Sequence, residues 1–219
     1  MLRVGLTGGI ASGKSVVGEM LVALGAQLIQ ADRIAHQLMQ PGQDVYAQVV
    51  AHFGGEILNP DQTINRSKLA EAAFAVPAAS SYNTSRIEEL NRLVHPAVVK
   101  RQNEWMDEVG RSDPHAIAVV EAALILEAGA AKDFDRLIVV TCGEDQRAAR
   151  FAARQNISLD KARREVERRM AAQMPDSEKI KAADFVIDNS GHLDQTREQV
   201  ALVWKKLRAG PGRQIGSRT

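Results

Sequence analysis

The sequence predicts an α/β fold built on a five-stranded parallel sheet. Three observations support this: short apolar segments alternate with longer stretches of helical spacing, a glycine-rich turn follows the first apolar segment, and two connections exceed what one crossover helix requires. Strands that alternate with helices are typical of a parallel sheet covered on both faces. At 219 residues, the chain has room for one domain with inserted lobes.

Each expected strand is rich in aliphatic or β-branched residues and is bounded by Gly, Asp or Asn. The five segments are Leu2–Thr7, Gln27–Gln30, Ala116–Val120, Arg136–Thr141 and Asp184–Ile187. The first helix is expected over Ser15–Leu24, where apolar residues every four positions share one face. Further helices are expected over Val45–His52, Arg66–Phe74 and Arg86–Val109, with a polar loop over Val76–Ser85. Pro96 is sufficient to explain a helix stop within the last of these.

The uneven spacing of the strands predicts the organisation of the chain. The expected nucleotide-binding core comprises residues 1–31, 115–143 and 182–207. Residues 32–114 form a helical acceptor lobe, residues 144–181 form a charged lid, and residues 208–219 form a tail that frays.

Composition and charge exclude several classes of protein. The chain has 28 Lys and Arg against 27 Asp and Glu, a net charge of +1, which argues against a globally basic nucleic-acid binder. A single cysteine, Cys142, excludes an internal disulfide framework, suits a reducing compartment and is expected to be a small core residue. Glu121 and Glu127 interrupt the most apolar run, so no helix is expected to span a membrane. We expect a cytoplasmic monomer or small homo-oligomer with no nucleic-acid or membrane partner.

The segment from Gly8 to Ser15, GGIASGKS, matches the phosphate-binding pattern G-x-x-x-x-G-K-[ST]. Glycines let successive backbone N–H groups converge on phosphate oxygens, and the N-terminus of the next helix adds partial positive charge. Lys14 can reach the β- and γ-phosphates, and the Ser15 hydroxyl can ligate Mg²⁺. The strand before the segment and the helix after it disfavour a chance glycine turn. The expected nucleotide contacts are Gly8, Gly9, Ala11, Ser12, Gly13, Lys14, Ser15 and Val16.

The surroundings of this loop indicate the type of nucleotide-binding protein. The N-K-x-D tetrapeptide of GTPases does not occur in the chain. The two long insertions are typical of small-molecule kinases, in which one lobe holds the acceptor and another closes over ATP and excludes water. Another nucleoside or nucleotide kinase is the nearest alternative. A non-catalytic nucleotide-dependent regulator is a second one, although it would need neither Asp32 nor a lid.

Several segments taken together resemble dephospho-CoA kinases. They are VGLTGGIASGKS, QADRIAHQLMQPG, the His95-Pro96 pair, EAALILEAG, AAQMPDSEK and ADFVIDNSG, and they occur in the order of the family from Val4 to Gly191. The resemblance implies that the γ-phosphoryl group of ATP is transferred to the ribose 3′-hydroxyl of dephospho-CoA, with Mg²⁺ bridging phosphates.

The resemblance also implies roles for residues of the acceptor lobe. Asp32 matches the family's catalytic aspartate, which orients or deprotonates the acceptor hydroxyl. By itself, its position allows equally that it caps the following helix. Ala35 and His36 are expected to line the acceptor pocket, although a lone exposed histidine is a poor candidate for a general base. His95 matches the family's His-Pro pair and is a further candidate contact to the acceptor.

Two positions depart from the family's pattern. Gln30 stands where the family commonly has the first aspartate of D-A-D, and an amide is expected to place a metal less well than that carboxylate. After the third strand, Glu121 and Ala123 replace the Asp and Pro of D-V-P-L-L-F-E. Glu121 is a candidate to support Mg²⁺ through water, while Leu124 and Glu127 are expected to contact the acceptor.

Arginines dominate the expected lid. Eight basic and three acidic residues lie between Arg147 and Arg169, a balance that suits a polyphosphate. Arg147, Arg150 and Arg154 share one helical face, and Arg150 and Arg154 match the family's R-x-x-x-R. A solvated charged surface is the alternative, and most of the later arginines are expected to form surface ion pairs. Asn189 resembles the family's adenine-side loop, although a simple turn also explains its segment.

Overall fold

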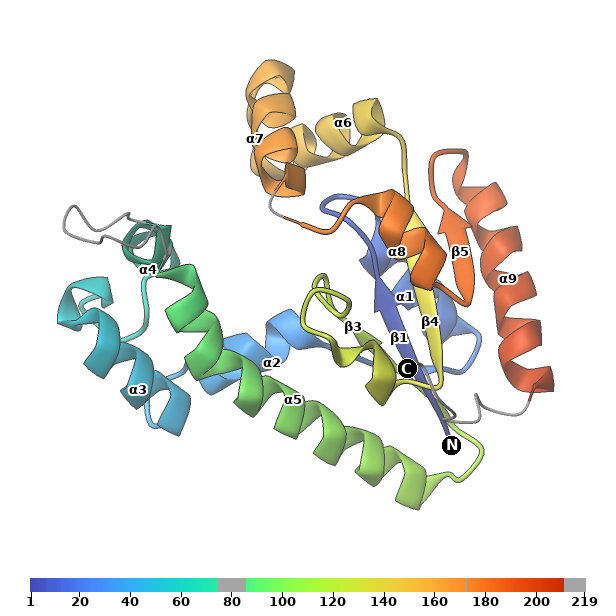
Figure 1. Ribbon diagram of the computed structural model, residues 1–219, viewed down its shortest axis with the longest axis horizontal. Coiled ribbons are helices and arrows are strands. Elements are labelled where there is room, and N and C mark those ends of the chain that lie inside the picture. Colours follow the sequence, from blue (N-terminus) through green and yellow to red (C-terminus); the bar gives the residue numbers. More distant parts are fainter. Residues whose placement is uncertain (75–85, 172, 211–219) are drawn as a thin grey trace. The chain divides into compact units, whose positions relative to one another are not determined.

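The computed structural model describes residues 1–74, 86–171 and 173–210 (Figure 1). The chain forms two compact units, which we call the sheet unit (Met1–Gln30 and Met106–Thr219) and the helical unit (Ala31–Trp105). The sheet unit holds the strands β1 (Leu2–Thr7), β2 (Gln27–Gln30), β3 (Ile117–Glu121), β4 (Arg136–Thr141) and β5 (Phe185–Asp188). Each strand begins and ends within one residue of the bounds expected from the sequence.

All five strands are parallel, in the order β2-β3-β1-β4-β5, which confirms the predicted sheet. The first strand is the central one: Leu2 lies opposite Ile117 of β3, and Val4 lies opposite Arg136 of β4. Because parallel strands end at the same edge, the segments that follow them all leave the sheet there. This edge carries the phosphate-binding loop.

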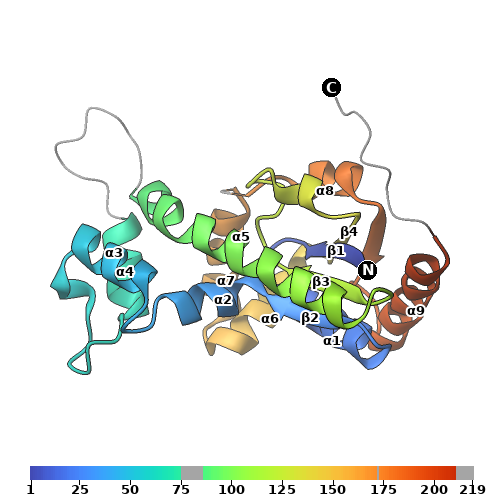
Figure 2. The same ribbon diagram turned by 90° about the horizontal axis from the view of Figure 1, so that it is seen from below.

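Helices cover both faces of the sheet (Figure 2). Helices α1 (Lys14–Ala23) and α9 (Leu193–Ala209) lie on one face, and the short helix α8 (Asp176–Ala182) lies on the other. Alternate residues of a strand point to opposite faces. In β1, Val4 and Leu6 are fully buried in the cluster with α1 and α9, whereas Gly5 faces Phe134 and Leu137 on the other side. Each such buried aliphatic side chain contributes about 1.5–3 kcal/mol.

The charged insertion after β4 consists of two further helices of the sheet unit, α6 (Glu144–Gln155) and α7 (Leu159–Ala171). They pack on each other through Phe151, Ala162 and Val166, all of which are buried. Asn156 ends α6 in the left-handed conformation with φ of 52°, which asparagine tolerates better than most residues.

The helical unit has a core of its own. It contains α2 (Ala31–Leu38), α3 (Asp44–Phe53), α4 (Arg66–Phe74), the short turn Gly55–Ile57 and the first part of α5 (Ile87–Ser112). Its buried apolar residues are Val45, Val49, Phe53, Ile57, Leu69 and Ala73. The expected helices are therefore present, and the expected loop Val76–Ser85 lies outside the described residues.

Helix α5 continues through Pro96, so the expected helix over Arg86–Val109 is present and the alternative of a helix stop at Pro96 fails. A proline inside a helix removes one hydrogen bond and costs about 3 kcal/mol. Around it, Leu93, Val94 and Ala97 pack against the core of the helical unit, and this burial compensates for the lost bond.

The bounds of the units differ from the predicted lobes at two places. The end of α5, from Met106 onwards, belongs to the sheet unit, whereas the acceptor lobe was expected to reach residue 114. Helix α9 extends to Ala209, so the first residues of the expected tail are helical. Within the described ranges, no helix is both long and apolar enough to cross a bilayer.

Candidate active site

The phosphate-binding loop connects the central strand β1 to α1, and its glycines are required by close contacts. Gly8 has φ of +155°, and a Cβ there would lie 2.2 Å from the carbonyl oxygen of Val140. Gly13 has φ of +91°, and a Cβ there would lie 2.0 Å from Nδ2 of Asn189. No side chain with a Cβ fits at either position, so the backbone N–H groups remain accessible.

The loop presents a positively charged ammonium group and a hydroxyl group whose hydrogen-bonding capacity is unused among the described residues. Lys14 Nζ donates to the carbonyl oxygens of Gly8 (2.8 Å) and Gly9 (3.2 Å), which curls the ammonium over the loop. Ser12 Oγ is buried and has no hydrogen-bond partner in the described part of the chain. Gly13 caps α1 without a side-chain bond, so the first N–H groups of the helix are also available. These features together favour a bound anion.

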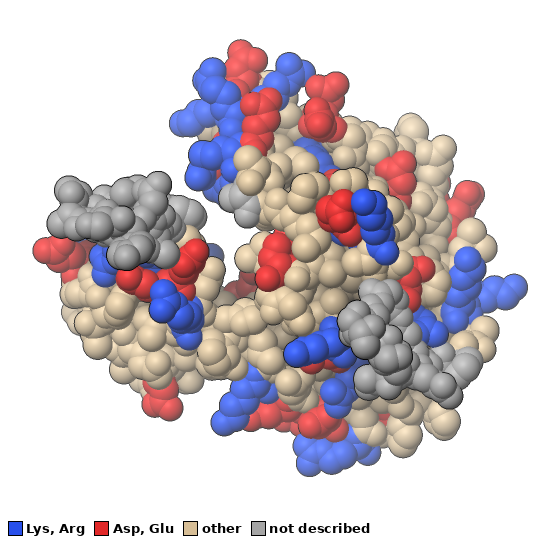
Figure 3. Space-filling model, viewed as in Figure 1, with Lys and Arg blue, Asp and Glu red and all other residues tan. Residues whose placement is uncertain are grey.

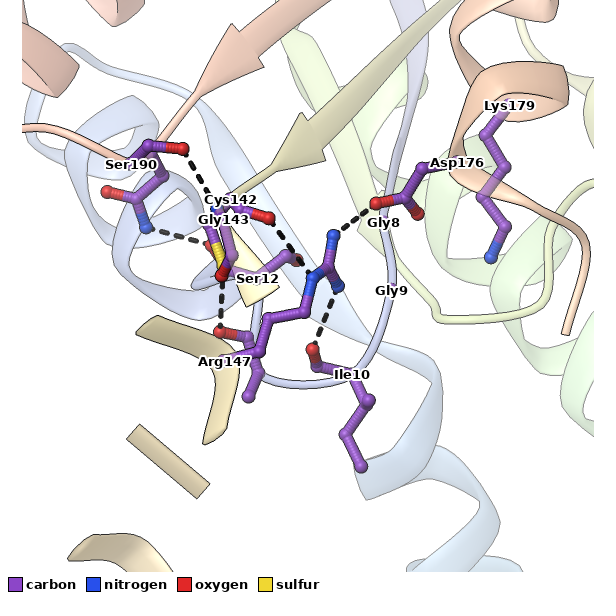
Figure 4. A network of polar contacts seen from close by, with 12 residues as sticks. Gly8, Gly9, Ile10, Ser12, Cys142, Gly143, Arg147, Asp176, Lys179 and Ser190 are labelled. Carbon is purple, nitrogen blue, oxygen red and sulfur yellow. Dashed lines mark hydrogen bonds and ion pairs between the residues drawn. The ribbon is translucent and has the colours of Figure 1, made fainter. Parts of the chain in front are cut away.

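The guanidinium of Arg147 lies inside the curve of the loop and supports it (Figure 4). Its guanidinium donates to the carbonyl oxygens of Cys142 (3.1 Å) and Ile10 (3.0 Å) and pairs with the carboxylate of Asp176 on α8. The side chain is only 1% exposed, so Arg147 does not lie on an open face with Arg154 as the sequence predicted. The helical spacing was right, but burial at the start of α6 turns Arg147 into a support for the loop.

Asn189 and Arg150 both contact the same loop at Ser12. Asn189 Nδ2 donates to the carbonyl oxygen of Ser12 (2.9 Å), and its Oδ1 accepts from Thr196 Oγ1 (2.9 Å). Arg150 donates to the carbonyl oxygens of Ser12 (3.4 Å) and Asn189 (2.9 Å). Asn189 is 3% exposed, so its amide is used inside the protein and is not presented to an adenine ring as expected.

Three side chains meet beside the loop at the ends of β2 and β3. Ser15 Oγ donates to Glu121 Oε1 (2.7 Å), and Gln30 Nε2 donates to Glu121 Oε2 (2.8 Å). Glu121 is 8% exposed, and both of its oxygens are oriented by these two donors. The hydroxyl of Ser15 and the carboxylate of Glu121 are hard oxygen ligands of the kind that Mg²⁺ prefers.

Glu127 has a structural partner instead of an open position toward an acceptor. Its Oε1 forms an ion pair with the fully buried Lys179 of α8 (2.8 Å) and accepts from the backbone N–H of Met174 (3.0 Å). Leu124, in the same segment, is 43% exposed and remains a candidate contact. A buried ammonium needs a nearby carboxylate, and this requirement explains why Glu127 turns inward.

The surface of α6 and α7 matches the expected pattern of ion pairs. Basic and acidic side chains intermingle over this part of the molecule (Figure 3). Arg168 and Arg169 both contact Glu165 and hold the pKa of its carboxyl down at about 2. Arg154 is exposed and stacks over the ring of Phe151 at 5.5 Å, which leaves its guanidinium accessible to a ligand.

Cys142 follows β4 and lies against the loop, where its Sγ donates to the carbonyl oxygen of Ala11 (3.7 Å). Burial raises the pKa of its thiol, which keeps it protonated and unreactive. The expectation of a small core residue is therefore consistent with its surroundings.

The other expected acceptor residues, apart from Leu124 and Glu127, belong to the helical unit. Asp32 is exposed in the first turn of α2, inside the helix, and makes no hydrogen bond or ion pair within the described ranges, so the alternative of a capping residue fails. On the same helix, Ala35 is half-buried, and His36 is exposed beside Gln40. His95 is exposed on α5.

Two findings at this site were not anticipated from the sequence. The pairing of Arg147 with Asp176 and that of Lys179 with Glu127 join residues of α6 and α8 to the loop and to the segment after β3. The sequence carries no local signal for either pair, because the partners lie far apart along the chain.

Replacing Arg147 by methionine is expected to lower the free energy of unfolding by about 3 kcal/mol, because Asp176 and two buried carbonyl groups lose their partner. The matched control is Arg163→Met, whose exposed pair with Asp145 is worth less than about 1 kcal/mol. Urea unfolding followed by circular dichroism measures both. Equal losses in the two variants would contradict a bracing role for Arg147.

The central loop and the parallel sheet place the chain in the class of P-loop kinases. More specifically, it belongs to the dephospho-CoA kinase family, whose profile matches residues 2–195. A dephospho-CoA kinase from Geobacter metallireducens is 42% identical over 206 residues, 94% of this chain and 96% of the relative. The activity that follows from family membership is phosphate transfer from ATP to dephospho-CoA.

Solved structures agree with this fold. The crystal structure of TT1252 from Thermus thermophilus superimposes with a TM-score of 0.72 at 27% identity and covers 94% of this chain and 97% of its own. Dephospho-CoA kinase from Campylobacter jejuni has a TM-score of 0.66 at 24% identity, with 94% and 96% covered. At this identity, the second likeness supports the fold alone.

Proposed function

We propose that the chain transfers the γ-phosphoryl group of ATP to the ribose 3′-hydroxyl of dephospho-CoA. The observation that carries the proposal is the braced loop between β1 and α1, with Lys14 curled over it and Ser12 Oγ buried without a partner. Such a loop is prepared for a polyphosphate before the nucleotide arrives. Family membership then selects the acceptor.

The loop would act on the phosphates through charge and position. Lys14 Nζ, now on two carbonyl oxygens, exchanges them for β- and γ-phosphate oxygens. The positive charge of the ammonium then stabilises the negative charge that develops on the phosphoryl group during transfer. Preorganised electrostatic contacts have their largest effect on such developing charge. Arg147 and Asn189 keep the loop in this shape and do not themselves touch the nucleotide.

The residues beside the loop fit a magnesium ion. Ser15 Oγ and Glu121 Oε1 lie 2.7 Å apart, one hydroxyl and one carboxylate, and Mg²⁺ typically takes one or two such ligands together with water and substrate phosphates. When bound, the ion neutralises phosphate charge. Ser15 would hold it directly, and Glu121 would hold it directly or through water.

Asp32 is the proposed catalytic base or orienting residue for the acceptor. It follows Gln30, the last residue of β2, by two positions and has no partner that would occupy its carboxylate in the described part of the chain. A carboxylate in that state can accept the proton of the ribose hydroxyl or align it for attack. Ala35, His36 and His95 are further proposed contacts to the acceptor from the helical unit, and Leu124 is a proposed contact from the sheet unit.

Arg150 and Arg154 are the proposed lid residues. Arg150 already touches the carbonyl oxygen of Ser12, so a small shift brings its guanidinium to a phosphate. Arg154 is exposed and can move further. Both would contribute positive charge around the γ-phosphate as the lid closes and excludes water.

The proposal extends to the compartment in which the protein works. A single buried thiol suits the reducing cytoplasm, and we expect a monomer or small homo-oligomer without nucleic-acid partners.

A coupled assay of ADP release tests the acceptor. We expect release that depends on dephospho-CoA and is at least about 100-fold slower with free nucleosides, because unpaired polar groups in a specific pocket penalise the wrong acceptor. ³¹P NMR of the product should show a new 3′-phosphate monoester. Equal rates with adenosine would favour a nucleoside kinase, release with water alone would indicate an ATPase, and binding of ATP without release would indicate a regulator.

A further inference from the structure

Gln30 occupies a place where its side chain can act on the metal ligand without touching the metal. It is the last residue of β2 and lies opposite Glu121, the last residue of β3, in the parallel register. The side-chain amide reaches across and donates to Glu121 Oε2 at 2.8 Å. The other carboxylate oxygen, Oε1, is thereby turned toward Ser15 Oγ at 2.7 Å.

The chemistry of the pair explains why an amide belongs at this position. Glu121 is buried, and a second carboxylate at position 30 would place two like charges at hydrogen-bond distance. An amide N–H instead supplies a charge-assisted hydrogen bond to the carboxylate. Because Glu has one more methylene group than Asp, its carboxylate also has an additional torsion to restrain, and the bond from Gln30 restrains it.

We propose that Gln30 is a positioning residue for the magnesium site: it fixes Glu121 so that the carboxylate and the Ser15 hydroxyl face the metal together. The two departures from the family's pattern, Gln30 and Glu121, then form one coupled unit. The inference rests on the proposed role of Ser15 and Glu121 in holding Mg²⁺. Removal of a side chain that hydrogen-bonds a metal ligand commonly lowers the affinity for the metal by about 10–100-fold.

The test compares ADP binding with and without Mg²⁺ by isothermal titration calorimetry, in the absence of any acceptor. Gln30→Met keeps the length of the side chain and removes the donor. The matched control is Gln27→Met, an exposed residue of the same strand opposite Ala118. We expect Gln30→Met to reduce the gain in ADP affinity from Mg²⁺ by about tenfold. Affinity for metal-free ADP should stay within about twofold, and the control should match the wild type.

A double-mutant cycle tests whether Gln30 acts on Mg²⁺ binding through Glu121. In a Glu121→Gln background, Gln30→Met should change the Mg²⁺ gain by less than about twofold, because the carboxylate it positions is gone. In steady-state kinetics, Gln30→Met should raise the Mg²⁺ concentration needed for half-maximal rate and leave KM for dephospho-CoA unchanged. A loss of stability alone would not produce either of these Mg²⁺-dependent effects. Thermal unfolding of each variant measures its stability separately.

The outcomes separate this inference from the proposal beneath it. If Mg²⁺ leaves the ADP affinity of the wild type unchanged, the metal role of Ser15 and Glu121 fails, and the role of Gln30 fails with it. If the wild type gains affinity and Gln30→Met gains as much, only the positioning role is overturned. The positioning role is also overturned if Gln30→Met weakens ADP binding equally with and without Mg²⁺. It is overturned as well if, in the Glu121→Gln background, Gln30→Met lowers the Mg²⁺ gain as much as it does in the wild type.

Discussion

Replacing Lys14 by alanine is expected to lower kcat by about 10²–10³-fold, the cost of removing one preorganised charge from a transferring group. The ammonium already rests on the carbonyl oxygens of Gly8 and Gly9, so its charge is held at the loop before the nucleotide binds. ATP affinity should fall as well, because the same ammonium contacts phosphate oxygens in the ground state. Steady-state kinetics and calorimetric ATP binding measure the two effects.

The control for Lys14→Ala is Lys205→Ala, which removes the same charge from an exposed position of α9 and should leave kcat unchanged. Circular dichroism spectra of both variants should match that of the wild type. A purified Lys14→Ala enzyme with the turnover of the wild type would disprove the assignment of the phosphate-binding loop.

Replacing Asp32 by asparagine is expected to lower kcat by about 10²–10⁴-fold, the range over which a positioned acid or base contributes. ATP affinity should stay near that of the wild type, because the proposed partner of Asp32 is the acceptor hydroxyl. The exposed carboxylate has no hydrogen bond or ion pair within the described ranges, so the variant should unfold at the temperature of the wild type.

Asp44 provides the matched control for Asp32→Asn. It is also an exposed aspartate in the first turn of a helix of the helical unit, and Asp44→Asn should leave kcat unchanged. If Asp32→Asn reduces only the affinity for ATP, its proposed role toward the acceptor is wrong. A fall of similar size in both variants would indicate a general effect of negative charge on this unit.

The strands and the loop were predictable from the sequence because their signals are local. Each strand is a short apolar run with turn residues at its ends, and each begins and ends within one residue of its expected place. The loop is specified by glycines and by Lys14 within eight consecutive positions. Pro96 shows where a local rule fails: packing of the surrounding apolar residues outweighs the lost hydrogen bond.

The supports of the site could not be predicted, since they depend on contacts between distant positions. Arg147 was placed on the correct helical face, but the carbonyl group of Ile10 that it binds lies 137 residues away. Asn189 was assigned to the nucleotide because its segment resembles the family's adenine-side loop. Its true partner, the carbonyl oxygen of Ser12, lies 177 residues away. Spacing along a helix predicts neighbours on one element and carries no information about the element opposite.

The distances between the loop and its supports have a consequence for synthesis of the chain on the ribosome. The loop directly follows β1, yet β1 lies in the middle of the sheet, and its flanking strands β3 and β4 are translated far later. At typical rates of translation, the 177 residues between Ser12 and Asn189 take about 10–35 s to make. The first strand is without its neighbours until β3 and β4 have been made, and the loop lacks Asn189 until the end of this interval. The ability to bind phosphate is therefore acquired only once Asn189 has been made, long after the loop itself.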